Sequence, residues 1–485
     1  MTYSKWIRCA VAAGLLTGWT AACDFIDPTS SNPNAVPDAS IDQLFVSGQV
    51  NAWFFNEGQL SRLVSVWTRQ MAGTDRQFAD LELYLGLGES TATDEFYRPY
   101  GSGNTRTGGG LLDLRRAQGL AEEDGRLVYK GILQVHEAFL IGMAASIWGD
   151  IPYSQAANPE FTEPVLDDQA DVYAAVQLLL DDAIDNLQSG TGAGPGENDF
   201  VFAGDATAWA AVAYTLKARL YLHWVEVDGN TRYTDALNAA QNGIQTAAGN
   251  WVSVHTATIP ESNLWNQFQN DRSGYISSNA YLVEMLDVDQ DRAYNPAVDD
   301  DRLPVYFTTG SAGFAGQYIG SPTGSPAGDP GTSASNLAVP GEADYGQPIL
   351  TCWENHLIVA EAEAVVGTEA NARTALQAAL DCQEDYWGGL GYTIDLGTVD
   401  AGLTGQALFD EIMAQKYMAM FLNIEVWNDH KRTCTPTIPP PPGETEVVAR
   451  LFYPNAERET NSNVPSPGVD PNDERNDNDP AACPP

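Results

Sequence analysis

The sequence is poor in positive charge, and above all in lysine. Its 485 residues include 24 lysines and arginines against 65 aspartates and glutamates, so the formal net charge is −41. Such an acidic surface repels nucleic acid and anionic lipid, and both are therefore excluded as partners. The few lysines are Lys5, Lys130, Lys217, Lys416 and Lys431.

Recognisable catalytic motifs are also missing. The sequence contains no HExxH pair, no GxSxG elbow, no phosphate-binding Walker loop and no dinucleotide fingerprint. With 65 acidic residues, some carboxylate pair will always suit glycoside hydrolysis, so such a pair carries no information. We therefore predict a protein that is not an enzyme and needs no cofactor. The scattered histidines are interpreted as surface or packed residues: His136, His223, His255, His356 and His430.

One acidic segment has the alternating carboxylates of a calcium loop, at residues 287–291 (DVDQD). Arg292 stands where an EF-hand needs its turn glycine, and Val298 where it needs its final glutamate, so an EF-hand is excluded. A solvated acidic loop is the preferred interpretation, and no metal site is predicted. A looser calcium site that uses an aspartate at 299, 300 or 301 stays open.

Long apolar runs are scarce, and the first residues are built like an export signal. Lys5 and Arg8 precede an apolar stretch over residues 10–20, and two alanines precede Cys23. This order predicts a lipoprotein signal peptide over 1–22, with Cys23 as the lipidated first residue of the mature protein. An ordinary signal cut near Ala22 is the alternative. No later segment is apolar for long enough to cross a membrane, so the mature chain is expected to be anchored by acyl chains alone.

The remaining chain is mostly helical in pattern. Residues 23–39 are rich in Pro, Asn, Ser and Asp and are predicted to be a tether, and residues 461–485 an acidic, disordered tail. Ser40 and Gln43 have the spacing of a capping box. Apolar residues recurring every three to four positions predict helices that stack as hairpins in one domain over 40–460. The predicted helices cover 40–71, 111–147, 168–187, 205–224, 234–246, 278–286, 352–366, 370–382 and 406–427.

Two segments interrupt the helical pattern, at about 74–110 and 251–348. Irregular segments of this length are usually functional. Their aromatic rings can stack on sugars, and an arginine beside them can bond hydroxyl groups, although the same rings can also pack the loops onto the helices. The candidate ligand-binding residues are Tyr97, Arg98, Tyr100, Tyr294, Tyr306, Phe307 and Tyr318.

Four cysteines follow Cys23, and an even number in an exported chain suggests disulfides. If 352–366 and 370–382 form an antiparallel hairpin that turns near Thr368, Cys352 and Cys382 lie at nearly the same height. A bond between them closes a loop worth roughly 3 kcal/mol in the chain-entropy model. Cys434 and Cys483 are then the remaining pair.

The order of several motifs resembles the SusD/RagB family of outer-membrane lipoproteins. The chain carries WGDIPYSQA, where the family has GDVPYSEA, and a GD…W…LKARL helix. Further segments resemble the family's mature start, its DPRLP and LAEA elements, its EAWADWRRT helix and its closing RLPYP segment. In this chain they are Cys23–Asp27, Trp148–Ala156, Asp171–Tyr173, Gly204–Leu222, Asp301–Pro304, Glu361–Ala364, Glu425–Thr433 and Arg450–Pro454.

The resemblance implies a mainly α fold, with a tetratricopeptide-like helical-hairpin scaffold and a loop-rich ligand-binding lobe. It also implies a surface-exposed lipoprotein of the outer membrane that binds a glycan or peptide. Such a protein delivers its ligand to a SusC-like, TonB-dependent β-barrel transporter. The alternatives are a surface glycoside hydrolase and a structural surface repeat protein.

Overall fold

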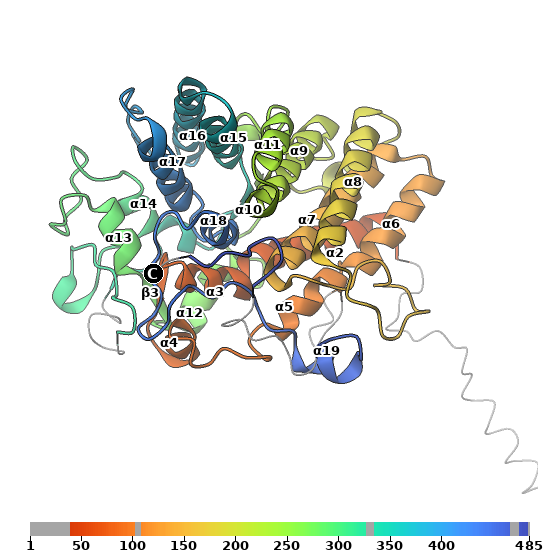
Figure 1. The fold of residues 1–485 in the computed structure, drawn as a ribbon, viewed down its shortest axis with the longest axis horizontal. Coiled ribbons are helices and arrows are strands. Elements are labelled where there is room, and N and C mark those ends of the chain that lie inside the picture. The colour runs from red at the N-terminus through yellow and green to blue at the C-terminus, as the bar shows by residue number, and fades with distance from the viewer. Residues whose placement is uncertain (1–38, 102–107, 326–333, 466–474, 484–485) are drawn as a thin grey trace, which may run out of the picture.

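The computed structural model describes residues 39–101, 108–325, 334–465 and 475–483, and its fold is mainly α-helical (Figure 1). The predicted signal peptide, Cys23 and the tether up to residue 38 lie outside the described residues. The strands are short and form two antiparallel pairs. β1 (Met71–Gly73) pairs with β3 (Ile276–Ser278), and β2 (Trp251–Val252) pairs with β4 (Pro348–Leu350).

A row of helices forms the scaffold and confirms the predicted tetratricopeptide-like architecture. Each helix packs on the next, in the order α7, α8, α9, α11, α15 and α16, and Figure 1 shows most of them side by side along the top. The helices of this scaffold are α6 (Leu111–Glu123), α7 (Leu127–Trp148), α8 (Gln169–Gln188), α9 (Ala206–Leu222), α10 (Val225–Asp228), α11 (Asn230–Ala240), α15 (Cys352–Val366), α16 (Glu369–Gly389) and α17 (Gly405–Ala419).

Helix α7 corrects one sequence expectation. It is long and apolar enough to cross a membrane by length and composition, whereas no such segment was expected after the signal. Its most apolar 18-residue window is entirely buried inside the protein, under α2, α6, α8 and α9. A helix that is apolar all round is the core of a large domain as readily as a membrane span, and here it is the core.

The other elements form a second, loop-rich lobe. The helix predicted over 40–71 is two helices, because the chain bends at Gly58, where a Cβ would come within 2.5 Å of the Phe54 carbonyl oxygen. Its capping box is confirmed: the Ser40 hydroxyl accepts from the Gln43 amide at 3.3 Å. The helices and 3₁₀ turns outside the scaffold are α2 (Ile41–Glu57), α3 (Gln59–Trp67), α4 (Arg76–Glu82), α5 (Thr93–Tyr97), η1 (Arg98–Tyr100), η2 (Gly196–Asn198), η3 (Ala247–Gly249), α12 (Leu264–Asp271), α13 (Ala280–Leu286), α14 (Leu303–Tyr306), η4 (Ala312–Phe314), η6 (Val339–Gly341), α18 (Glu425–Thr433) and α19 (Asn455–Thr460).

The predicted final helix over 406–427 is also divided. α17 ends at Ala419, and α18 starts at Glu425 and continues to Thr433. Every residue from 425 to 432 is buried, although five of these eight side chains are acidic or basic. Because α18 is enclosed on all sides, its sequence has no apolar stripe from which its bounds could be predicted.

Both predicted disulfides are present in the structure. Cys352 and Cys382 join α15 to α16, with their Cα atoms 6.2 Å apart. Cys434 and Cys483 join the end of α18 to the C-terminal segment, with Cα atoms 5.2 Å apart. The structure therefore differs from the expected disordered tail over 475–483, where Asn476, Asn478 and Asp479 are almost fully buried.

Candidate functional site

The seven candidate ligand-binding residues lie in three separate places. Tyr97, Arg98 and Tyr100 lie on α5 and η1. Tyr294 and Tyr318 lie in the loops that surround α14, while Tyr306 and Phe307 belong to the core. Figure 1 shows α13 and α14 at one end of the molecule and α5 near its middle.

Tyr306 and Phe307 are removed as ligand-contacting candidates. Only 2% and 1% of their surfaces are exposed. The Tyr306 ring stacks on Phe421 with centroids 4.5 Å apart, and its hydroxyl donates to the Met418 carbonyl at 3.1 Å. The internal space beside Tyr306 holds only about 20 Å³, enough for a water but not for a sugar. The segment LPVYF is apolar without a break, which is typical of a buried chain.

Tyr294 and Tyr318 are half-buried neighbours over the acidic loop. The Tyr294 hydroxyl donates to Asp301, and the Tyr318 amide donates to the Arg292 carbonyl at 2.9 Å. Burial and the Asp301 carboxylate raise the pKa of Tyr294, so its hydroxyl stays neutral at physiological pH. These contacts show two rings that the fold holds in place at the surface.

Arg98 is engaged by the protein itself. Its Nε donates to Glu95 Oε2 at 2.9 Å, and its guanidinium lies 5.4 Å from the centre of the Phe54 ring. Its carbonyl accepts from Asn51 Nδ2 at 3.0 Å. Arg98 therefore fixes η1 against α2. We assign it a structural role in holding these two elements together, and not a direct role in ligand binding.

On one side of Arg98, Tyr97 and Tyr100 line a cavity of about 190 Å³. The Tyr100 hydroxyl is shielded from solvent and has no hydrogen-bond partner among the described residues. Burial, assisted by the Glu457 carboxylate, raises the pKa of both tyrosines. Both hydroxyls therefore remain neutral at physiological pH. Its other lining residues include Phe96, Pro152, Ala156, Thr162, Pro164, Glu457 and Asn461.

On the other side of Arg98 lies a larger hollow of about 440 Å³, here called the aromatic hollow. Trp53 and Phe54 come from α2, and Phe200 comes from the loop before α9. The Phe54 and Phe200 side chains are unusually open for aromatic rings, at 36% and 48% exposure. The other lining residues are Val50, Glu57, Val254, His255, Thr256, Pro260, Glu261, Ser262 and Leu264.

An ion pair forms the polar wall of the aromatic hollow. His255 Nε2 lies 2.8 Å from Glu57 Oε1, and its Nδ1 lies 3.0 Å from the Glu261 carbonyl oxygen. Burial lowers the pKa of His255, but the hydrogen bond to Glu57 and its charge outweigh that effect, so the pKa lies above its ordinary value. The hollow thus combines flat apolar faces with charged hydrogen-bonding groups.

A second, open hollow of about 450 Å³ begins where α2 ends. It is lined by Gln59 and by residues 90–95, which offer hydroxyl, amide and carboxylate groups. The segment from residue 90 to residue 100 therefore borders the polar hollow and the tyrosine-lined cavity in turn, and its Arg98 contacts Phe54 of the aromatic hollow. An elongated ligand with alternating apolar faces and hydroxyls would find matching groups along it.

Sequence reasoning located η1 but missed the aromatic hollow. Trp53 was interpreted as core, and Phe54 and Phe200 were not selected. One signal was available: residues 53–55 are three consecutive aromatics, and an α-helix turns 100° per residue, so the three cannot share one face. Trp53 and Phe55 are buried, and Phe54 points outward.

The SusD-like family model, described as "Starch-binding associating with outer membrane", matches residues 71–454. No protein with a curated description matches the sequence. Members of the family are binding proteins and not enzymes, in agreement with the sequence expectation.

Solved structures of low sequence identity share the fold. A SusD/RagB family protein from Bacteroides thetaiotaomicron is 22% identical, with a TM-score of 0.67 over 88% of this chain and 95% of that one. A SusD homologue from Bacteroides uniformis is 18% identical, with a TM-score of 0.72 over 88% and 94%. A chitin-binding SusD homologue from Flavobacterium johnsoniae is 18% identical, with a TM-score of 0.68 over 87% and 94%. The family match, which spans most of the chain, shows that this protein belongs to the SusD-like family.

Proposed function

We propose that this protein captures a glycan at the cell surface and delivers it to a TonB-dependent β-barrel transporter in the outer membrane. Lipid on Cys23 anchors it beside that SusC-like partner, facing the exterior. The family's description as starch-binding and outer-membrane-associated supports this proposal, as do the two structural relatives described as chitin-binding.

The observation that carries glycan binding is the aromatic hollow. Sugar rings have apolar faces formed by their C–H groups, and these stack on aromatic rings. Phe54 and Phe200 expose much of their rings at the mouth of a 440 Å³ hollow, a volume in the range of small-ligand sites. A monomeric soluble protein gains nothing in stability from rings exposed in this way, so they favour an interaction surface.

The polar groups around the hollow define the class of glycan. Glu57, His255 and Glu261 can accept from or donate to sugar hydroxyls. The chain as a whole carries a formal charge of −41, which repels polyanionic polysaccharides. We therefore propose a neutral or amino-sugar glycan as the ligand.

Anchoring explains how modest affinity would suffice. A lipid on Cys23 would keep the protein in the same membrane as the transporter. The bound glycan would then be at a high effective concentration near the transporter, which favours transfer. Weak binding also lets the ligand leave toward the transporter. Purification of the native protein from membranes should therefore co-isolate a large β-barrel protein, and Cys23→Ala should abolish that association.

Affinity electrophoresis through gels containing starch or soluble chitin oligomers tests glycan capture. The Phe54→Ala, Phe200→Ala double variant should weaken retention about tenfold, which corresponds to about 1.4 kcal/mol. Leu178→Ala is the matched control, because Leu178 is a 67%-exposed apolar residue on the scaffold helix α8. Equal melting temperatures of the variants would show that the fold is kept.

Two results would contradict the proposal. Retention of the double variant equal to that of Leu178→Ala would remove the aromatic hollow from glycan binding. Steady release of soluble sugars from the polysaccharide would instead support the hydrolase alternative.

A further inference from the structure

Three carboxylates meet in the loop between α13 and α14. Asp287 and Asp289 follow the end of α13, and Asp299 comes ten residues later. One oxygen from each carboxylate can be chosen so that all three lie within 4.8 Å of one another. Asp287 and Asp299 are buried, with 3% and 7% exposure, and Asp289 is open to solvent. The loop therefore forms a half-closed acidic cup.

Asp287 has an oxygen that the protein leaves without a partner. Its Oδ2 accepts from the Arg292 amide at 3.0 Å. Its Oδ1 is shielded from solvent, and no described residue donates a hydrogen bond to it. An unpaired carboxylate oxygen in a buried position is costly, and native proteins rarely keep one without an ion, a water or a ligand.

The part of the chain that the structure describes supplies this cup with no ion-pairing cation. Among the described residues, no lysine, arginine or histidine forms an ion pair with Asp287, Asp289 or Asp299. The neighbouring Arg302 is engaged by Asp300, at 2.5 Å. Three carboxylates that converge without a cation repel one another strongly.

The backbone nevertheless holds the carboxylates in position. Asp299 Oδ1 accepts from the Val288 amide and its Oδ2 from the Asn295 amide, both at 2.8 Å. Asp289 accepts from the Asp291 amide at 3.3 Å. A carboxylate oxygen has two lone pairs, so each oxygen that accepts one amide can still bind a cation.

We propose that Asp287, Asp289 and Asp299 bind a calcium ion. A site made of oxygens alone suits a hard cation and not zinc. Calcium–oxygen distances of about 2.3–2.6 Å allow two ligands to lie up to about 5 Å apart, whereas the magnesium sphere allows only about 4.2 Å. The three oxygens all lie within 4.8 Å of one another, which is inside the limit of the calcium sphere.

Calcium would order the surface that this loop supports. The Arg292 amide donates to Asp287, and the Arg292 carbonyl accepts from the Tyr318 amide at 2.9 Å. Asn295, which follows Tyr294, donates to Asp299. Tyr318 is thus linked to Asp287 through Arg292, and Tyr294 is linked to Asp299 through Asn295. This inference does not depend on glycan binding.

Calorimetric titration of the metal-depleted full chain with CaCl₂ tests the site. One calcium ion per chain is expected, with a Kd of about 10⁻⁴–10⁻³ M, as in extracellular modules. MgCl₂ should bind at least tenfold more weakly. Asp287→Asn and Asp289→Asn should each weaken calcium binding at least tenfold. Asp344→Asn, an exposed aspartate elsewhere in the lobe, should leave the affinity unchanged.

Melting in EDTA and in calcium separates binding from folding. The native chain should melt at a higher temperature in calcium, and Asp289→Asn, whose side chain is exposed, should fold normally but lose this increase. No heat of binding and no change in melting temperature at 10 mM calcium, well above that Kd, would overturn the proposal. Calcium affinity in Asp289→Asn equal to that of Asp344→Asn would overturn it as well.

Discussion

His430 is a base enclosed at the centre of the protein, on α18. Its side chain is 4% exposed, and its Nδ1 lies 3.3 Å from the Pro436 carbonyl oxygen. Burial is the main cause that lowers the pKa of His430 to about 4; the contact with the Pro436 carbonyl opposes this effect, and the charge of Arg475 assists it. At physiological pH this histidine is therefore neutral in the folded protein.

This depressed pKa predicts a specific acid sensitivity. An unfolded histidine binds a proton near pH 6.5, whereas folded His430 resists protonation down to about pH 4. The contribution of neutral His430 to the unfolding free energy is fully present above pH 6.5. It is lost as the pH falls from 6.5 to 4, because the unfolded chain then binds a proton that the folded chain does not. Between pH 7.5 and 4.5 the native chain should lose about 2–3 kcal/mol of unfolding free energy from this residue.

His430→Gln isolates that contribution, because glutamine does not titrate. Urea denaturation of both chains at pH 7.5 and pH 4.5 should show a loss of unfolding free energy that is about 2–3 kcal/mol smaller in the variant. Other acidic and basic groups act equally in both chains and cancel. Identical losses would show that His430 titrates as an exposed histidine does.

The candidate residues show what a single sequence can predict at this scale. Residue type selected Tyr97 and Tyr100, which line a cavity in the structure. It could not distinguish them from Tyr306, because the burial of an aromatic residue depends on neighbours distant in sequence, here Phe421. Phe54 and Phe200 are 146 positions apart, and only the packing of the loop before α9 on α2 brings them together.

At the scale of elements, α18 is held by buried ion pairs from several helices. Arg219 of α9 binds Glu354 of α15 through two contacts of 2.5 and 2.7 Å, and its Nε also lies 3.8 Å from Glu425 of α18. Glu425 of α18 accepts from His223 at 2.8 Å, and Lys416 of α17 lies 2.8 Å from Asp429 of α18. These pairs fix the scaffold helices around α18, so they define its position as well as its charge balance.

Breaking one of these pairs should be costly. Arg219→Met removes the guanidinium group and leaves the buried Glu354 carboxylate without the cation that pairs with it. Removing one partner of a buried pair typically destabilises a protein by about 3–5 kcal/mol. Chemical denaturation should therefore give an unfolding free energy lower by about that amount.

The double variant Arg219→Met, Glu354→Met is the informative control. It removes both charges and fills similar volume, so it should be more stable than the single variant by at least about 2 kcal/mol. If the double variant is as unstable as the single one, the loss comes from packing and not from an uncompensated charge.

Predicted elements agree with the structure where one face is apolar and the other polar. The helix predicted over 168–187 is α8 at Gln169–Gln188, because its aspartates lie on the solvent side. The breaks between α2 and α3 and between α17 and α18 were not predicted. The first depends on backbone packing at Gly58, and the second on a polar helix buried on every side.

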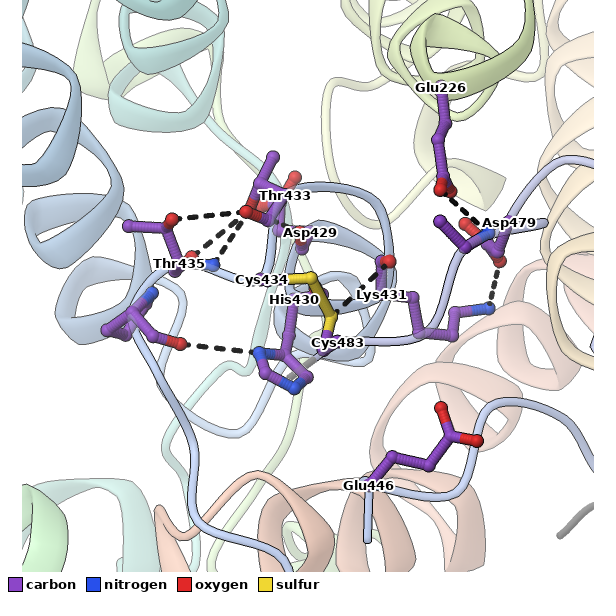
Figure 2. Close-up of a disulfide and its surroundings, with 12 residues drawn as sticks. Glu226, Asp429, His430, Lys431, Thr433, Cys434, Thr435, Glu446, Asp479 and Cys483 are labelled. Atoms are coloured by element: carbon purple, nitrogen blue, oxygen red, sulfur yellow. Dashed lines mark hydrogen bonds and ion pairs between the residues drawn. A yellow bond between two sulfur atoms is a disulfide. The ribbon is translucent and has the colours of Figure 1, made fainter. Parts of the chain in front are cut away.

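At the scale of the whole molecule, the C-terminal segment 475–483 connects several scaffold helices (Figure 2). Asn476 donates to the Ser146 carbonyl of α7, and Asn478 donates to the His223 carbonyl after α9, both at 3.0 Å. Asp479 pairs with Lys431 of α18 at 3.0 Å, and Cys483 is bonded to Cys434. The Asn- and Asp-rich composition of this segment predicted disorder. Composition alone cannot reveal that these polar side chains have buried partners elsewhere in the chain.

The segment should therefore contribute to the stability of the whole domain. Lys431 is 2% exposed, and burial lowers its pKa although Asp479 opposes that effect. A chain that ends at residue 465 would leave Lys431 buried without its carboxylate, and it would also lose the disulfide loop of 49 residues. That loop is worth about 4 kcal/mol in the chain-entropy model, and the lost ion pair about 3–5 kcal/mol.

Three variants separate these two contributions. Asp479→Asn should lose only the ion pair, and Cys434→Ser with Cys483→Ser should lose only the disulfide, so each should melt between the native chain and the truncated one. Hydrogen exchange should rise at the amides of α18 in the truncated chain more than in either variant, because only truncation removes every contact of the segment. The hairpin of α15 and α16 keeps its own disulfide and should exchange more slowly than α18. A truncated chain that melts with the native one would show that segment 475–483 rests on the scaffold without supporting it.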